Sequence, residues 1–128
     1  MSKSFRVQSY LEHILNAIER IERYTMDMDV LGFLDSDLVQ DAVIRNIEII
    51  GEASNKIQRA SPEFISQNDN VPWDYMYTMR NRVAHGYEHV DLEIVWKTIV
   101  EDLPLLYQQI NSLVEDGNLI QETPSPKL

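Results

Sequence analysis

The chain has 128 residues and a mass of 14.9 kDa, which fits one domain, since a single hydrophobic core commonly occupies about 100–150 residues. Hydrophobic residues make up 44% of it, which excludes wholesale disorder. Its 21 acidic and 11 basic residues leave a formal charge of −10, which argues against a broadly basic nucleic-acid surface but permits a small local basic site.

The chain contains no cysteine, so disulfides, thiolate metal ligands and a cysteine nucleophile are excluded. No uncharged apolar run follows the first six residues, and charged residues interrupt the first helical segment. We therefore expect no secretory signal and no membrane span, and a cytoplasmic location.

Apolar residues recur at three- and four-residue steps from Phe5 to Tyr24, which predicts an amphipathic helix. The residues Phe33–Ser36 are typical of a helix entry with Asp35 or Ser36 as the cap. The same apolar period then predicts a second long helix, to about Arg59.

The order Ser61-Pro62-Glu63 is that of a helix start, and it predicts a short helical turn before a loop at residues 67–70. Pro72 repeats the start signal for a third main helix, which we expect to end at Gly86.

Asp91 can cap a fourth helix that runs to Gly117, with Pro104 bending it. No alternating strand pattern competes with these segments. The sequence thus predicts an all-α, up-and-down bundle of four to five helices, with a domain at residues 1–117 and a flexible tail at residues 118–128.

Some apolar residues widen the helix faces beyond a single stripe, and either a homodimer or a slightly larger core would cover them. They are Ile44, Ile49, Val100, Leu105 and Val114.

The sequence contains no glycine-rich phosphate loop, no nucleophile elbow and no His-Glu-x-x-His metal pair. The candidate catalytic residues are therefore those of a single segment, residues 79–89. Arg80, Asn81, Arg82, His85 and Tyr87 lie close together in this segment, whose basic character opposes the charge of the whole chain.

A guanidinium binds phosphate and an imidazole transfers protons near neutral pH, while RNA supplies its own nucleophile, the 2′-hydroxyl. These groups suit cleavage of a phosphodiester without a metal ion. One imidazole cannot easily act as both base and acid, but a two-fold dimer would bring two copies of Arg80 and His85 to a shared cleft.

The pattern Arg80-Asn81-x-x-x-His85-x-Tyr87 resembles the arginine-x4-histidine-x-tyrosine motif of HepT-like toxins in the HEPN superfamily. The similarity also includes Trp73 and the segment Ile49–Ala53, and it extends over most of the chain.

The resemblance implies a dimeric, metal-independent endoribonuclease toxin with Arg80 and His85 as catalytic residues, acting on mRNA or tRNA and leaving a 2′,3′-cyclic phosphate or its hydrolysed form. It also implies an MntA-like nucleotidyltransferase antitoxin that transfers AMP from ATP to Tyr87, and possible higher oligomers with that partner. Phosphate charge and adenine bulk beside His85 would obstruct RNA entry.

Simpler roles compete for these residues. Arg80 could pair with Asp74 or Glu88 on the surface, and His85 could be a helix-terminal residue favoured by the dipole. Asn81 fits a supporting role that orients Arg80, and Tyr87 could be an unmodified packing residue.

Other polar and aromatic side chains also have more than one possible role. His85 and His89 have the spacing of a helical metal pair, but Gly86 separates them and no third ligand is obvious, so we expect no metal and no cofactor. Arg82, Lys56 and Arg59 are candidates for RNA steering or ordinary surface charge. The residues that could stack on bases or belong to the core are Tyr75, Met76, Tyr77 and Trp96.

Two other functions remain open from the sequence. The acidic charge would slow association with RNA, which favours a non-catalytic HEPN-type module that binds and regulates a nucleotidyltransferase. A plain helical dimerisation domain would leave the Arg80–Tyr87 cluster unexplained.

Overall fold

The computed structural model describes residues 2–85 and 90–122, with side chains placed at residues 2–82 and 90–116. All regular structure in these ranges is helical, which confirms the predicted all-α class. The elements are α1 (Lys3–Thr25), α2 (Val30–Leu34), α3 (Asp37–Ala60), α4 (Pro62–Gln67), α5 (Trp73–His85), α6 (Leu92–Lys97), the π-helical segment η2 (Thr98–Asp102) and α7 (Leu103–Glu122).

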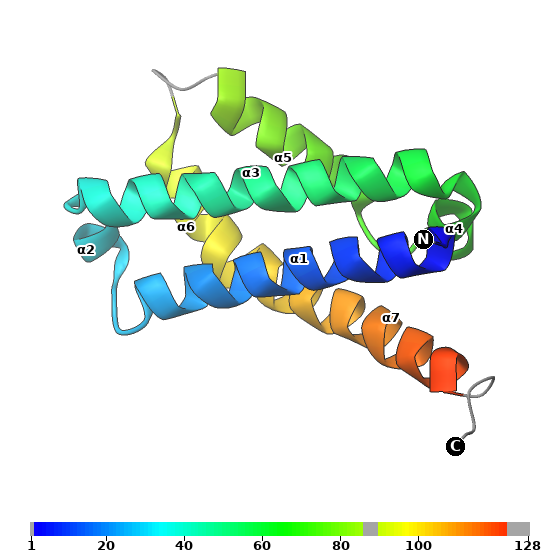
Figure 1. The fold of residues 1–128 in the computed structure, drawn as a ribbon. Coiled ribbons are helices and arrows are strands. Elements are labelled where there is room, and N and C mark those ends of the chain that lie inside the picture. Colours follow the sequence, from blue (N-terminus) through cyan, green and yellow to red (C-terminus); the bar gives the residue numbers. More distant parts are fainter. Residues whose placement is uncertain (1, 86–89, 123–128) are drawn as a thin grey trace.

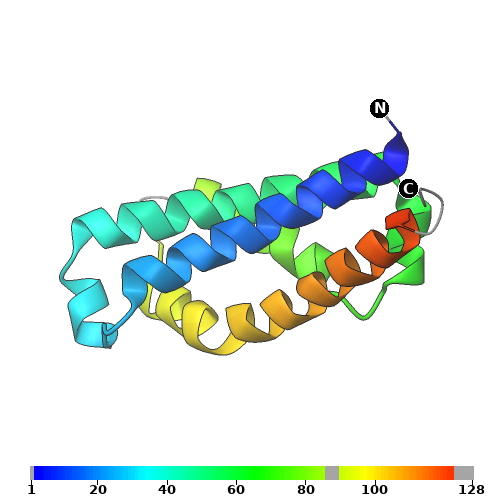
Figure 2. The ribbon, with the colours of Figure 1, turned by 60° about the horizontal axis from the view of Figure 1, so that its bottom comes forward.

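The long segments run alternately up and down the bundle, as predicted (Figure 1). Helices α1 and α3 lie antiparallel, α5 packs on α3, and α6, η2 and α7 form the fourth segment, which packs on α1 through α7. Figure 2 shows that the start of α1 and the end of α7 lie at the same end of the bundle.

Three of the side chains that begin helices are those that the sequence indicated. Ser36 Oγ accepts a hydrogen bond from the backbone N–H of Val39 at 3.2 Å at the start of α3. Ser61 Oγ caps α4, whose first residue is proline, and Asp91 Oδ1 caps α6. These oxygens satisfy backbone donors that have no partner within the helix.

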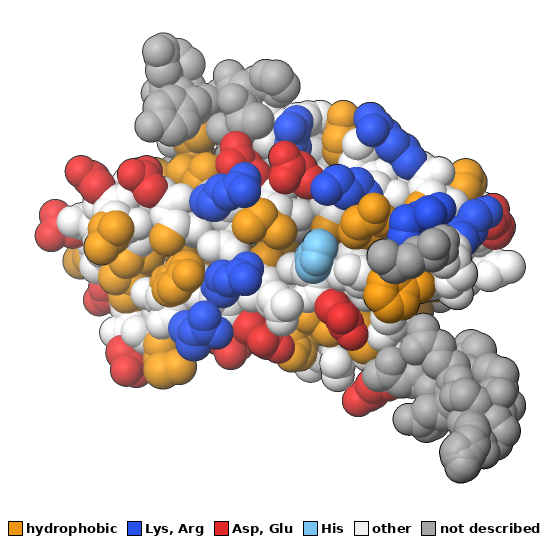
Figure 3. All heavy atoms as spheres, in the orientation of Figure 1, with side chains coloured by type: hydrophobic (Ala, Val, Ile, Leu, Met, Phe, Trp, Pro, Cys, Tyr) orange, Lys and Arg blue, Asp and Glu red, His pale blue; other side chains and the backbone are white. Residues whose placement is uncertain are grey.

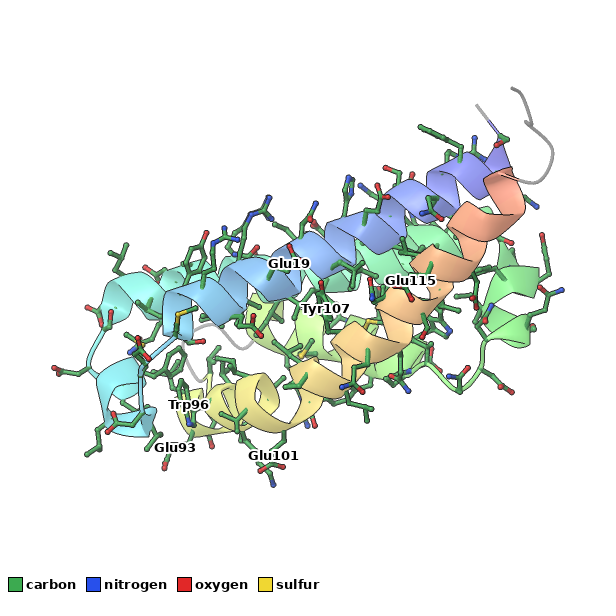
Figure 4. All side chains as sticks on the ribbon, turned by 90° about the horizontal axis from the view of Figure 1, so that it is seen from below. Glu19, Glu93, Trp96, Glu101, Tyr107 and Glu115 are labelled. Atoms are coloured by element: carbon green, nitrogen blue, oxygen red, sulfur yellow. The ribbon has the colours of Figure 1, made fainter. Side chains whose placement is uncertain are left out.

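One hydrophobic core joins all the long helices, because each directs an apolar face inward. Its largest fully buried apolar side chains are Phe33, Leu11, Ile14, Ile21, Ile47, Ile50, Ile57, Met76, Ile110, Val43 and Val71. Figure 4 shows Tyr107 of α7 beside Glu19 of α1, where the tyrosine hydroxyl donates a hydrogen bond of 2.6 Å to the carboxylate. This bond ties the fourth segment to the first.

One short helix was missed, and one expected boundary was wrong. The sequence indicated only a helix entry at Phe33–Ser36, but residues 30–34 form α2, capped by Asp29 and anchored by Phe33 against Trp96. Five residues are too few to show a helical period. The fourth helix was expected to end at Gly117, but α7 continues to Glu122, since an interior glycine costs a helix only about 1 kcal/mol.

At the start of α7, Pro104 disturbs the helical hydrogen bonding in the turn before it. Proline has no N–H to donate, and its ring conflicts with the carbonyl four residues earlier, which here belongs to Val100. The hydrogen-bond ladder is π-helical at Thr98–Asp102, directly before this proline, and the chain changes direction between α6 and α7 (Figure 1).

Among the helices in the described ranges, none combines the length and the apolar character that crossing a membrane requires.

Candidate functional site

Two hydrogen bonds join the first turn of α5 to the preceding loop and to α3. The indole N–H of Trp73 donates to the carbonyl of Asn68 at 2.9 Å, which holds the entry to α5. Ser54 of α3 is fully buried, and its hydroxyl donates to the carbonyl of Trp73 at 3.2 Å. The position of α5 along α3 is therefore set at Trp73, two turns before the candidate residues.

The two helices are in close contact at Gly51. A Cβ atom at this position would lie 2.1 Å from Cβ and 2.7 Å from Cγ of Arg80, and 3.1 Å from the carbonyl oxygen of Met76. No side chain fits there without movement of α5. The glycine thus lets the stem of Arg80 rest directly on the α3 backbone.

The guanidinium of Arg80 is held by groups from two helices. One terminal nitrogen, Nη1, donates to Oδ1 of the neighbouring Asn81 at 3.1 Å, and the other, Nη2, lies 3.8 Å from Oε2 of Glu52 on α3. The side chain retains 30% of its exposure. Because a guanidinium has five N–H donors, Arg80 keeps donors for a phosphate while its orientation is restrained.

The observed ion pair of Arg80 differs from the surface pairs that the sequence suggested. Asp74 lies on α5 itself and Glu88 lies outside the described residues, whereas the partner found, Glu52, comes from α3. In the sequence, Glu52 stands out only as a member of the family-like segment Ile49–Ala53. Its place beside Gly51 was the only feature of the sequence that could have indicated the pairing with Arg80. The spacing of residues along one helix does not show which residues of another helix they contact.

His85 is the last residue of α5 and follows Asn81 by one helical turn. Its side chain, and the whole of Tyr87 and His89, lie outside the described residues. Arg82 is exposed on α5. The structure therefore brings Arg80 and Asn81 into contact and places Arg82 and the backbone of His85 on the same helix.

A groove of about 290 Å³ lies between α5 and the η2–α7 segment. It is lined by Pro72, Tyr75, Met79, Asp102, Leu103, Leu105, Leu106 and Gln109. The hydroxyl of Tyr75 donates to Oδ2 of Asp102 at 2.5 Å. Burial and, next, this hydrogen bond to a carboxylate raise the pKa of Tyr75 above its ordinary value.

The four candidates for base stacking separate into two groups. Trp96 packs on the buried Phe33, with ring centroids 5.4 Å apart, and Met76 is fully buried, so both belong to the core. Tyr75 and Tyr77 are 40% and 38% exposed. Of these four residues, only Tyr75 and Tyr77 therefore expose an aromatic ring that could stack on a base.

Other titratable candidates lie away from α5. His13 of α1 meets the ring of Tyr10 edge-on, and Lys56 of α3 lies over that ring at 5.8 Å from its centroid. In the part of the chain that the structure describes, no three His, Asp or Glu side chains are grouped as metal ligands.

Comparisons with known proteins agree on one family. The family model described as "Ribonuclease HepT-like" matches residues 14–113. A protein of Thermococcus cleftensis named "Probable ribonuclease HepT" is 41% identical over 106 residues, which cover 83% of this chain and 94% of that protein. A "Putative RNase" of Caldanaerobacter subterraneus is 31% identical over 83% of this chain and 92% of its own.

A further relative is a longer protein. The Methanocaldococcus jannaschii protein named "Gamma-glutamylcyclotransferase and putative RNase" is 41% identical over 110 residues, which are 86% of this chain and 48% of that protein. The chain therefore spans about half the length of this relative. No solved structure was found to match the fold.

Proposed function

Because the chain belongs to the HepT-like ribonuclease family, we propose that it is an endoribonuclease that cleaves RNA without a metal ion through Arg80 and His85. The observation that carries the proposal is the placement of Arg80 on α5, the helix that ends at His85. The stem of Arg80 rests on Gly51 of α3. Its guanidinium is restrained by Asn81 of α5 and Glu52 of α3. A restrained cation five residues before an imidazole-bearing residue on the same helix suits a phosphodiester substrate.

In this mechanism the 2′-hydroxyl of RNA attacks the adjacent phosphorus and loses its proton to an imidazole. The bond from phosphorus to the 5′-oxygen breaks, and the leaving oxygen takes up a proton, so that a 2′,3′-cyclic phosphate and a 5′-hydroxyl result. Arg80 stabilises the negative charge that grows on the phosphate oxygens. Asn81 orients Arg80, and Arg82 steers RNA toward the site.

We propose that two copies of the chain share this site, so that one His85 accepts a proton and the other donates one. The surface near the groove supports a dimer: Val100 and Leu105 are 54% and 58% exposed. The other three residues that were expected to be covered by a dimer or a larger core do not contribute to this surface. Val114 is buried in the core, and Ile44 and Ile49 are partly buried against it. Leu105→Glu would place a charge in this surface and should shift sedimentation from dimer to monomer, whereas an unchanged dimer would exclude this face.

We further propose that the protein is the toxin of a cytoplasmic toxin–antitoxin pair, and that an MntA-like nucleotidyltransferase silences it by transferring AMP to Tyr87. The position of Tyr87 two residues after His85 supports this. AMP would bring negative charge to the entrance of a phosphate-binding site. Mass spectrometry after incubation with ATP and the nucleotidyltransferase should find AMP on the wild type and none on Tyr87→Phe.

The test of the ribonuclease proposal is cleavage of total tRNA and mRNA in EDTA by protein that is free of partner and free of AMP. His85→Ala and Arg80→Ala should each abolish cleavage. The helical circular dichroism signal should stay unchanged, because Arg80 is not part of the hydrophobic core and His85 is the last residue of α5. His13→Ala and Arg45→Ala are the matched controls, since each removes the same side-chain type from α1 or α3, and both should cleave like the wild type. A 2′,3′-cyclic phosphate on the product would support attack by the 2′-hydroxyl.

Cleavage that persists in His85→Ala would refute the catalytic assignment. No cleavage by clean, unmodified wild-type protein would favour the second function, a non-catalytic module that binds and regulates a nucleotidyltransferase. The formal charge of −10 is the observation that favours this second function, because it opposes association with RNA.

A further inference from the structure

The negative charge of the chain is concentrated at the end of the bundle where α2 lies. Residues 22–41 include the end of α1, all of α2 and the start of α3. They contain one basic residue, Arg23, and the acidic residues Glu22, Asp27, Asp29, Asp35, Asp37 and Asp41. This short stretch therefore supplies half of the formal charge of −10.

The most exposed of the large apolar side chains that the structure describes lie at the same end. Leu38 is 80% exposed, Leu31 is 72% exposed and Met26 is 62% exposed, and Leu34, also on α2, reaches the surface. Figure 3 shows hydrophobic side chains gathered at this end of the molecule with acidic side chains around them. We call Met26, Leu31, Leu34 and Leu38 the α2 patch.

The α2 patch is built on a fixed frame. Phe33, between Leu31 and Leu34, is fully buried and packs on Trp96 of α6, which Figure 4 shows next to α2. Asp29 Oδ1 accepts the Gly32 N–H at 2.8 Å.

A second set of bonds joins α2 to α3. The side-chain amide of Gln40 donates to the carbonyls of Phe33 and Leu34, at 2.9 and 3.1 Å. Ser36 caps α3 between them. The exposed leucines are thus held in place before any partner binds, so their burial costs little ordering entropy.

We propose that the α2 patch is a docking site for a second protein whose surface has an apolar centre and a basic rim. An apolar centre is needed to cover Leu31 and Leu38, which are exposed by more than two thirds, and a basic rim complements the surrounding carboxylates.

Two copies of this chain do not fit, because an isologous contact would set two acidic rims against each other. RNA is repelled by the same carboxylates. The proposal is independent of the ribonuclease assignment, since it uses none of the residues of α5.

The test uses two labelled synthetic amphipathic helices as probes, with the full-length protein and fluorescence anisotropy as the readout. Both probes carry the same leucine face, one with lysine and the other with glutamate at the flanking positions. The lysine probe should bind at least about tenfold more tightly than the glutamate probe, and raising salt from about 50 mM to about 300 mM should weaken it.

The double variant Leu31→Gln/Leu38→Gln should weaken binding of the lysine probe by about tenfold or more, since burial of a leucine side chain is worth at least that factor. Both leucines are exposed, so the variant should keep the wild-type unfolding midpoint. The matched control is Phe5→Gln, which removes an exposed apolar side chain at the other end of α1 and should bind the probe like the wild type.

Three results would overturn the proposal. The first is equal affinity for the two probes, or no binding of the lysine probe. The second is unchanged binding by the double variant. The third is a wild-type dimer that the double variant converts to monomer in sedimentation velocity, because the patch would then be covered by a second copy.

Discussion

The contact at Gly51 allows a quantitative test of how α5 is placed. In an ordinary helix interior, Gly→Ala stabilises by about 1 kcal/mol. In Gly51→Ala the new methyl group would lie 2.1 Å from Cβ of Arg80, whereas ordinary contacts lie at 3.4–4 Å, so the helices must separate by more than 1 Å. Overpacking of a well-packed interior costs typically 1–3 kcal/mol and occasionally more.

The upper part of that range applies, because the methyl group also meets the carbonyl of Met76, which is backbone and cannot move without α5. We expect a net loss of about 2 kcal/mol in the free energy of unfolding, or roughly 8 °C in Tm at about 4 °C per kcal/mol. Urea and thermal unfolding measure it. RNA cleavage should fall as well, because Arg80 is displaced from its position over α3.

The control for this prediction is Gly32→Ala on α2. There the nearest atom to a new Cβ is Oδ1 of the Asp29 side chain at 3.3 Å, which can adjust. Its stability should change by less than about 1 kcal/mol. A Gly51→Ala protein as stable as the wild type would refute the reasoning, since it would mean that α5 does not rest on α3 at Arg80.

Three further predictions concern single contacts. Ser54→Ala removes the buried hydrogen bond to the Trp73 carbonyl and should lower the free energy of unfolding by about 1 kcal/mol, as urea unfolding would measure; an unchanged value would mean that this bond does not hold α5. Glu52→Gln breaks the 3.8 Å pair with Arg80 but should change stability by less than about 0.5 kcal/mol, because both side chains remain partly exposed; a larger loss in the same measurement would contradict this. The hydrogen bond to Glu19 raises the pKa of Tyr107 above 10.0, so its stabilising effect is complete below that pH and is lost as pH rises through the raised pKa. Tyr107→Phe should therefore be less stable than the wild type near neutral pH, and the difference should shrink above pH 10 in unfolding curves measured across this range, whereas a constant difference would contradict the assignment.

The helices could be predicted from the sequence because the signals that start them are local. Ser36, Ser61 and Asp91 cap helices through backbone donors two or three residues away, and apolar periodicity shows the inward face of each long segment. The signal was too short at α2, where Phe33 is held by Trp96, a residue distant in sequence.

The sequence also singles out the candidate site residues, but it does not show how they are arranged in space. The segment that contains Arg80, Asn81 and His85 stands out by residue type and spacing, and the contact between Arg80 and Asn81 joins neighbours on one helix. The role of Gly51 and the pairing of Glu52 depend on which faces of α3 and α5 meet.

The sequence by itself determined an all-α chain, its main helices and the segment with candidate chemistry, because residue type, period and capping act over a few residues. Only the tertiary structure decided which apolar side chains are buried: Val114 lies in the core, while Val100 and Leu105 remain exposed. It also decided that Arg80 is held between two helices, since the crossing of α3 and α5 depends on packing between residues that are far apart in the chain.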